Sequence, residues 1–206
     1  MRRFRKSSYT KREFFKGKHR FEHWYRDNTL YFITSRTRDR SLAFASSEAK
    51  QIFWDRFDHY AKQYDFRPII GTLLNNHYHT VGYVEQGENV WRFIQRFHGS
   101  TAKLVNDTLA KRLVPFWRRE GNQDYFDGCL RDETQFCRAY GYTLLQAVRA
   151  RIVRDWRDYP HARVGGSRSR GRARSGIARH LSRGSSLPTV SAPGLETWSL
   201  KRPRRW

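Results

Sequence analysis

Two histidines, His77 and His79, stand two residues apart in a stretch with the composition of a β-strand. Side chains alternate between the two faces of a strand, so both imidazoles would project from the same face. Imidazole nitrogens are common ligands of divalent metals, and the pair could therefore bind one cation. A His-x-His pattern alone more often reflects ordinary packing, so chemistry requires a second group nearby.

Tyr142 and Gln146 are candidates for that second group. They lie four residues apart in a segment with helical periodicity, so they would project from one face of a helix. A phenol can act as a nucleophile, and a glutamine amide offers a neutral oxygen ligand. If this face packs over the strand of the histidines, His77, His79 and Gln146 could hold a cation that keeps positions open for a phosphate oxygen.

Tyr140 is the alternative nucleophile on the same helix. The residue four positions after it is Leu144, which cannot bind a metal, so the pattern favours Tyr142. A core aromatic is the alternative role for Tyr142. A phenol ionises near pH 10, so at neutral pH the attack would need help from a metal such as Mg²⁺ or Mn²⁺.

The elements that would position these side chains follow from hydrophobic periodicity and capping residues. Ser46 or Ser47 can cap a first helix, and Asp132 with Gln135 three residues later forms a capping-box pattern for the last helix. We expect strands over 29–37, 68–75 and 125–130. We expect helices from the serine cap to about 64, over 88–112, and from 132 to about 153. Residues 80–85 would either continue the second strand or pair with it.

The net charge of +22 indicates a polyanionic partner, most simply a nucleic acid. A solvated basic surface is the alternative. His98 is expected with the charged residues on or near the solvent side of the 88–112 helix. The candidates for phosphate contacts are Arg36, Arg38, Arg92, Arg96, Lys103, Arg118 and Arg119.

Charge and composition divide the chain into three parts. Residues 1–27 interleave basic and aromatic side chains, as in an arm that pairs phosphates and stacks bases, and 28–162 would form the folded domain. Residues 163–206 are rich in Arg, Gly and Ser, which predicts a disordered basic tail. No apolar run approaches the length of a membrane span, and Cys129 and Cys137 are expected to be free thiols. We therefore expect a cytoplasmic protein.

These pieces, in this order and spacing, resemble the single-tyrosine HUH transposases, and most closely the REP-associated tyrosine transposases of bacteria. Together the matching stretches cover about residues 28–160. They are LYFITSRTRDR (30–40), NNHYHTVGYV (75–84), WRFIQRFHGSTAKLVND (91–107), FWRR (116–119) and LRDETQFCRAYGYTLLQAVRARIV (130–153).

The resemblance implies an α+β fold, in which helices pack on a ferredoxin-like antiparallel sheet, known as the HUH endonuclease/transposase fold. It also implies metal-dependent cutting and rejoining of single-stranded DNA beside a hairpin, in a bacterial protein associated with the nucleoid that acts as a monomer or homodimer. By position, His77 and His79 match the metal-binding pair, Tyr142 the nucleophile and Gln146 the third ligand. The chain departs from the family at Gly82, which interrupts the apolar run after the histidines.

Three other functions account for part of the pattern. A non-catalytic nucleic-acid-binding protein explains the charge and the aromatic residues but not the combination of the two motifs. A replication initiator or relaxase would share the histidine pair, although initiators commonly place a lysine after the tyrosine and relaxases usually place the tyrosine first. A metal-dependent hydrolase would be expected to carry a carboxylate ligand near His77 and His79.

Overall fold

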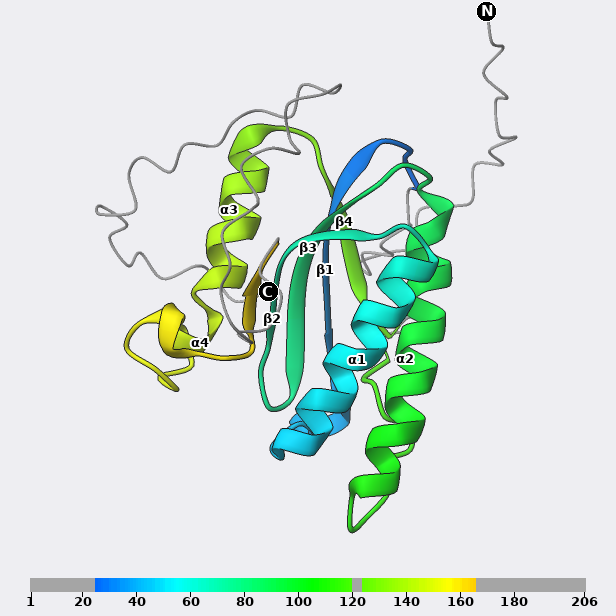
Figure 1. Ribbon diagram of the computed structural model, residues 1–206, viewed down its shortest axis with the longest axis vertical. Coiled ribbons are helices and arrows are strands. Elements are labelled where there is room, and N and C mark those ends of the chain that lie inside the picture. The colour runs from blue at the N-terminus through cyan, green and yellow to red at the C-terminus, as the bar shows by residue number, and fades with distance from the viewer. Residues whose placement is uncertain (1–24, 120–123, 166–206) are drawn as a thin grey trace, which may run out of the picture. The chain divides into compact units, whose positions relative to one another are not determined.

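The computed structural model describes residues 25–119 and 124–165 (Figure 1). The expected arm, apart from residues 25–27, and the expected tail, apart from residues 163–165, lie outside the described residues. The strands are β1 (Thr29–Arg36), β2 (Arg67–Leu73), β3 (His77–Val84), β4 (Phe126–Leu130) and β5 (Ala162–Val164). The helices are α1 (Ser47–Gln63), α2 (Glu88–Thr108), α3 (Glu133–Leu144) and α4 (Gln146–Arg149), with short 3₁₀ turns at Arg38–Arg40 and Trp156–Asp158.

The five strands form one sheet in the order β4-β1-β3-β2-β5, and every pairing is antiparallel. The expected mixed fold, with helices packed on an antiparallel sheet, is therefore confirmed. β2 and β3 form a hairpin. The segment 80–85 therefore pairs with the second strand and does not continue it. β3 lies at the centre of the sheet, between β1 and β2, and it carries both histidines.

One face of the sheet is covered by α1 and α2, which lie side by side in Figure 1. Five of the side chains that these two helices bury are large aromatic rings. Several of these rings meet edge to face: Phe53 and Phe57 of α1 each lie within 5.5 Å of the ring of Phe97 on α2, measured between centroids. Tyr78 of β3 joins this core and is almost fully buried.

The opposite face of the sheet is covered by α3 (Figure 1). Leu144 packs with Ile70 of β2 and Val81 of β3 in a smaller apolar cluster. The hydroxyl of Thr72 on β2 donates a 2.8 Å hydrogen bond to the backbone carbonyl of Thr143. This buried bond and the apolar cluster fix the C-terminal half of α3 against the sheet.

Several expected boundaries were wrong. α2 ends at Thr108 instead of 112, and the helix expected from 132 to about 153 divides into α3 and α4 at Leu145. Leu145 has φ −89° and ψ 7°, which lies outside regular helix geometry. β5 pairs with β2 and includes residues 163 and 164, so the sheet continues past the domain boundary predicted at 162.

Gly82 interrupts the apolar run of β3 because an aromatic ring occupies the space where its side chain would be. A Cβ atom built on Gly82 would lie 2.3 Å from the ring of Phe66. That ring is itself stacked on Phe93 at 4.8 Å and is buried. The glycine therefore serves close packing in the aromatic core.

Candidate active site

The alternation of β3 places His77 and His79 on the face covered by α3, and Tyr78 between them on the other face. The centroids of the two imidazole rings lie 5.0 Å apart, with the rings nearly perpendicular. The turn before them is held by backbone bonds, from Phe44 to the carbonyl of Asn75 and from Thr37 to the carbonyl of Asn76. The histidine pair is therefore fixed at the start of a central strand.

His79 is a buried imidazole, and neither of its ring nitrogens has a hydrogen-bond partner. Its side chain stacks on the ring of Phe32 with 5.8 Å between centroids. Burial, together with the positive charges of His77 and Arg149, holds the pKa of His79 well below its usual range. Because the ring is neutral at physiological pH, it keeps a lone pair that is free to bind a metal.

His77 lies next to His79 but has polar partners. Its Nδ1 is 2.6 Å from the side-chain oxygen of Asn76. Burial lowers the pKa of His77, and a hydrogen bond with Gln146 partly opposes that shift. A partner that fixes one nitrogen of a histidine also orients its ring, as is common for metal-binding histidines.

Tyr142 of α3 lies against the histidine pair. Its ring meets the ring of His79 edge to face at 5.0 Å and that of Phe32 at 6.0 Å. The side chain is 39% exposed, so a strand of nucleic acid could reach the phenol. Tyr140, the alternative nucleophile, instead packs with Phe136 in the apolar cluster under α3.

Gln146 is the first residue of α4 and is 7% exposed. Its Nε2 donates a 3.1 Å hydrogen bond to the backbone carbonyl of Tyr142. The two residues therefore keep their one-turn relation across the helix break at Leu145. The structure brings together all four predicted site residues, His77, His79, Tyr142 and Gln146.

This group of side chains fits a divalent cation. The unpartnered nitrogens of His79 are the strongest sign, because buried polar atoms without partners are rare unless an ion or ligand completes them. Within the described residues, no three or more His, Cys, Asp or Glu side chains gather as a metal site. The available third ligand is therefore the neutral amide of Gln146, which leaves the cation its full charge for a phosphate.

Arg149 of α4 is a site residue that sequence reasoning missed. The central carbon of its guanidinium group lies 5.1 Å from the centroid of the Tyr142 ring. The two residues are seven apart, and this spacing of about two helical turns is the signal that could have found it. A fixed positive charge over the phenol ring holds the ring in place and attracts phosphate.

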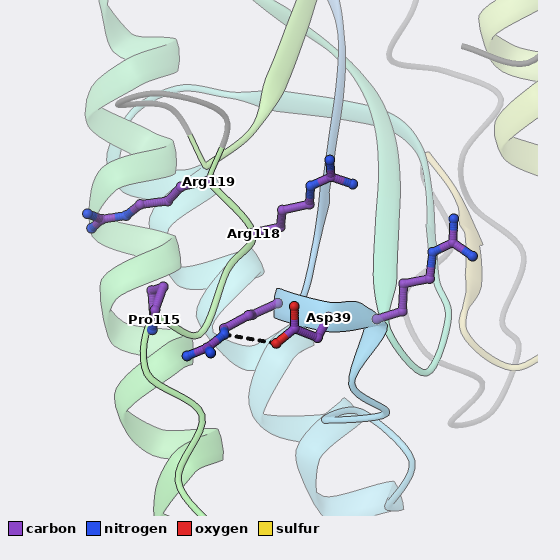
Figure 2. A pocket seen from close by; sticks show the side chains of 6 residues that line it. Asp39, Pro115, Arg118 and Arg119 are labelled. Atoms are coloured by element: carbon purple, nitrogen blue, oxygen red, sulfur yellow. Dashed lines mark hydrogen bonds and ion pairs between the residues drawn. The ribbon is translucent and has the colours of Figure 1, made fainter.

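A group of arginines lies next to this cluster, at the end of β1. The register pairs Arg36 with His77 across the two strands. Beyond Arg36 the chain turns and pairs with residues 116–118, through bonds from Arg38 N–H to Phe116 carbonyl and from Arg118 N–H to Arg36 carbonyl. This pairing forms an open pocket of about 570 Å³, here called the arginine pocket, whose lining residues are Arg38, Asp39, Arg40, Pro115, Arg118 and Arg119 (Figure 2).

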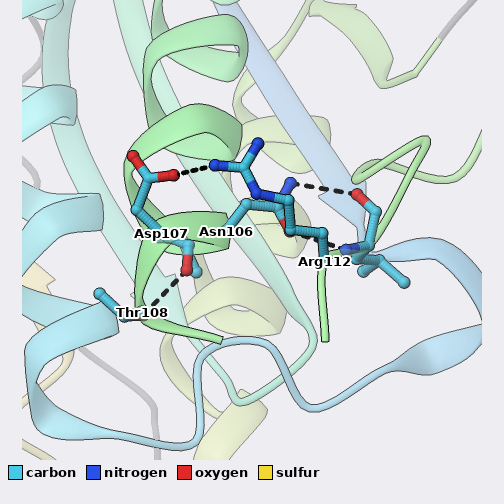
Figure 3. A network of polar contacts seen from close by, with 6 residues as sticks. Asn106, Asp107, Thr108 and Arg112 are labelled. Carbon is cyan, nitrogen blue, oxygen red and sulfur yellow. Dashed lines mark hydrogen bonds and ion pairs between the residues drawn. The ribbon is translucent and has the colours of Figure 1, made fainter. Parts of the chain in front are cut away.

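A polar network joins the last turn of α2 to the segment that follows it (Figure 3). The side chain of Asn106 donates to the carbonyl of Leu113 and accepts from its N–H, at 3.1 and 2.7 Å. Arg112, in the segment after the helix, pairs with Asp107 of α2. These contacts hold the start of the segment that carries Arg118 and Arg119.

The remaining predicted phosphate contacts lie elsewhere. Arg92, Arg96 and Lys103 are exposed on α2, which covers the opposite face of the sheet from α3. Arg92 also pairs with Glu88 at 3.3 Å. The structure therefore groups Arg36, Arg38, Arg118 and Arg119 at the end of β1, whereas Arg92, Arg96 and Lys103 lie on α2.

His98 is buried at 2% exposure, so its expected place on the solvent side of α2 was wrong. One ring nitrogen lies 2.8 Å from the hydroxyl of Tyr78, and the other lies 3.1 Å from a carboxylate oxygen of Asp124. Burial raises the pKa of Asp124, but the contact with His98 outweighs burial and holds the pKa of this carboxyl below its usual range. Asp124 lies 26 positions after His98, so the contact between them produces no local pattern from which the burial of His98 could be predicted.

Within the part of the chain that the structure describes, every helix is too short or too polar to cross a membrane. Neither Cys129 nor Cys137 forms a disulfide within the described residues.

Comparisons with known proteins bear on the fold. No family model and no curated protein matches this sequence. Among solved structures, a REP-associated tyrosine transposase bound to a REP hairpin matches with a TM-score of 0.57 and 14% identity, over 69% of this chain and 80% of that chain. A candidate transposase from Deinococcus radiodurans R1 matches with a TM-score of 0.41 and 14% identity, over 63% of this chain and 95% of that chain. The score of the second match is too low to support an argument, and the first shows that this protein has a transposase-like fold.

Proposed function

We propose that this protein is a metal-dependent transposase or endonuclease that cuts and rejoins single-stranded DNA through a 5′-phosphotyrosine intermediate. One observation carries the proposal. The ring of Tyr142 contacts a buried imidazole, His79, whose nitrogens have no protein partner. A nucleophile next to an incomplete set of metal ligands is the arrangement that phosphoryl transfer requires. The transposase-like fold is consistent with this chemistry.

In the proposed reaction, the phenol oxygen of Tyr142 attacks the scissile phosphorus. A bond forms between that oxygen and phosphorus, the bond from phosphorus to the 3′ oxygen breaks, and the phenol proton is lost as the 3′ oxygen gains one. Mg²⁺ or Mn²⁺ bound by His77, His79 and Gln146 would supply charge stabilisation at the phosphate oxygens. Arg149 would hold the phenol and the phosphate in place. The covalent bond retains the energy of the phosphodiester, so a second 3′-hydroxyl can reverse the step.

The arginine pocket would hold the strand beside the cut. Guanidinium groups pair well with phosphates, and Arg38 of the pocket follows two residues after Arg36, the register partner of His77. A DNA hairpin from palindromic repeats is the proposed recognition element, as in the REP hairpin of the similar solved structure. Such a protein would act in the bacterial cytoplasm, on the nucleoid.

The test is a covalent adduct assay. Labelled single-stranded oligonucleotides, taken from the hairpins that flank the gene, are incubated with the protein and Mn²⁺ and separated under denaturing conditions. We expect an adduct that Tyr142→Phe abolishes. Tyr140→Phe is the matched control, because it removes a hydroxyl from the same helix and should leave the adduct.

Two other outcomes would reject the proposal. An adduct that persists in Tyr142→Phe but is lost in Tyr140→Phe would move the nucleophile to the other tyrosine. Metal-dependent DNA affinity without cleavage of any hairpin substrate would support the alternative, a non-catalytic or domesticated nucleic-acid-binding protein on the same fold.

A further inference from the structure

A second pocket adjoins the arginine pocket and has no role in the proposed reaction. It has a volume of about 940 Å³, and it shares Pro115 and Arg119 with the arginine pocket. Its other lining residues come from α2, from the segment that follows it, and from Tyr25 and residues 124–125. The ones that matter below are Tyr25, Trp91, His98, Trp117 and Asp124.

The walls of this pocket, here called the aromatic pocket, expose large rings to solvent. Trp91 and Tyr25 are each 36% exposed. Exposed aromatic rings that gather around one hollow cost free energy in water, and they typically mark a binding site. The guanidinium group of Arg92 lies over the ring of Trp91 at 5.8 Å, which keeps a positive charge next to this wall.

The inner wall of the aromatic pocket is rigid and polar. The rings of Trp117 and His98 stack with 4.2 Å between centroids, and the indole N–H of Trp117 donates to the backbone carbonyl of His98 at 3.1 Å. His98 is held in turn by Tyr78 and Asp124. Trp117 and His98 are 4% and 2% exposed, so they fix the base of the pocket, and a planar ligand would meet the exposed rings of Trp91 and Tyr25.

Charge identifies the chemical class of the ligand. Arg119 lines both pockets, and Arg38, Arg40 and Arg118 line the adjoining one, so a ligand in the aromatic pocket would have its anionic part at the arginines. A nucleotide has both parts: a planar base for the aromatic pocket and a phosphate for the arginines. Single-stranded DNA offers this combination at every position, because each base has a face that stacks on aromatic side chains.

We propose that the aromatic pocket captures an unpaired nucleobase of single-stranded DNA whose phosphates cross the arginine pocket. Backbone pairing relates the two pockets to the histidine pair: Arg36 is the register partner of His77, the Arg118 N–H bonds to the Arg36 carbonyl, and Arg119 lines both pockets. The captured base thus lies on the α2 side of the sheet, away from the bond that is cut. This inference rests on the proposed single-stranded DNA substrate.

The test compares two strands that differ only in their bases. Fluorescence anisotropy measures the affinity of the full-length protein for a labelled oligothymidine and for an abasic strand of equal length and charge. Loss of one base stack reduces affinity by about five- to a hundredfold. We expect the wild type to prefer the oligothymidine and Trp91→Ala to lose roughly tenfold of that preference.

Leu104→Ala is the matched control, because Leu104 is also 36% exposed on α2 but does not line the pocket. It should keep the preference of the wild type. Trp91→Phe retains a stacking ring and should restore most of the preference lost in Trp91→Ala. Far-ultraviolet circular dichroism and melting temperatures check that each variant is folded.

Three results would overturn the inference: equal affinity of the wild type for both strands, an unchanged preference in Trp91→Ala, or an equal loss in Leu104→Ala. Displacement of the oligothymidine by thymidine monophosphate, without any preference for bases in the strand, would assign the pocket to a free nucleotide instead. The adduct assay separates the two proposals. A base preference in a protein that forms no adduct would reject the proposed function alone, and an adduct formed by a protein without any base preference would reject this inference alone.

Discussion

At the scale of single residues, His79 constrains the site most. An imidazole that is neutral, buried and without partners loses the hydrogen bonds that it would make with water. A bound cation would offset that cost. The contact of His79 with the Tyr142 ring would then place the phenol next to that cation.

Replacement of Arg149 by glutamine is predicted to slow formation of the covalent adduct by about 10- to 100-fold, because a preorganised charge near the reacting groups contributes strongly to phosphoryl transfer. The guanidinium group lies 5.1 Å from the Tyr142 ring centroid. The single-turnover rate at saturating DNA measures the effect. Arg149→Lys should recover part of the rate, whereas Arg151→Gln, at an exposed arginine nearby, should keep it. Equal rates for both glutamine variants would contradict a role for Arg149.

His161 makes the stability of the protein depend on pH. Burial, with help from Lys50 and Arg163, lowers the pKa of His161 from 6.5 to about 4. The unfolded chain binds a proton at this residue more readily, so stability is full above pH 6.5 and falls as the pH drops towards 4. His161→Gln should show a smaller decrease in melting temperature over this range. The same flattening in His59→Gln, at an exposed histidine, would show that His161 is not the cause.

The residues of the site could be proposed from the sequence because local spacing carries the information. The pleat of a strand relates His77 to His79, and one helical turn relates Tyr142 to Gln146. The isolation of His79 and the burial of His98 could not be proposed in the same way. Both depend on contacts between segments far apart in the chain, such as that of His98 with Asp124.

At the scale of elements, the division between α3 and α4 differs most from expectation. The apolar periodicity from 132 to 153 predicts one helix, but Leu145 departs from helical backbone angles. Its N–H still bonds to the carbonyl of Gly141, so helical hydrogen bonding continues up to the break. The residue types around Leu145 do not signal the break. The side chain of Gln146 bonds across the break to Tyr142, which keeps the predicted pair together.

Gly82→Ala is predicted to destabilise the protein by about 1–3 kcal/mol, the usual range for overpacking a core. The new methyl group would overlap the ring of Phe66, which is itself fixed against Phe93. The free energy of unfolding in urea measures the change. Gly99→Ala is the matched control. Nothing lies within 4 Å of its added Cβ, and an alanine in helix α2 should stabilise by up to about 1 kcal/mol. An unchanged stability in Gly82→Ala would contradict the packing account.

At the scale of the whole molecule, the two faces of the sheet have different roles, one structural and one at the candidate active site. The face under α1 and α2 holds the aromatic core, and the face under α3 holds the candidate active site (Figure 1). The end of β1 connects the two sides, because residues 36–40 and 115–119 form the arginine pocket there. The mixed fold could be predicted from periodicity, but the strand β5 could not, since its three residues lie next to an Arg- and Gly-rich stretch.

The net charge of +22 predicts that DNA affinity falls steeply with salt. Arg40→Gln removes one charge from the arginine pocket, so the slope of log affinity against log salt concentration should decrease by about 0.7, the value for one phosphate contact on a single strand. Arg157→Gln is the matched control, because that arginine is exposed and pairs with Asp155 away from the pocket. Identical slopes for the two variants would show that the pocket does not hold phosphate.

The central claim is that the phenol of Tyr142 and a cation at His77 and His79 act together on one phosphate. Mass spectrometry of the protease-digested adduct tests this most directly, because it identifies the residue that carries the nucleotide. The account predicts a 5′-nucleotide on the peptide that contains Tyr142, formed with Mn²⁺ and absent both with a chelator and in His79→Ala. A nucleotide on any other residue, or on Tyr142 without a divalent cation, would contradict it.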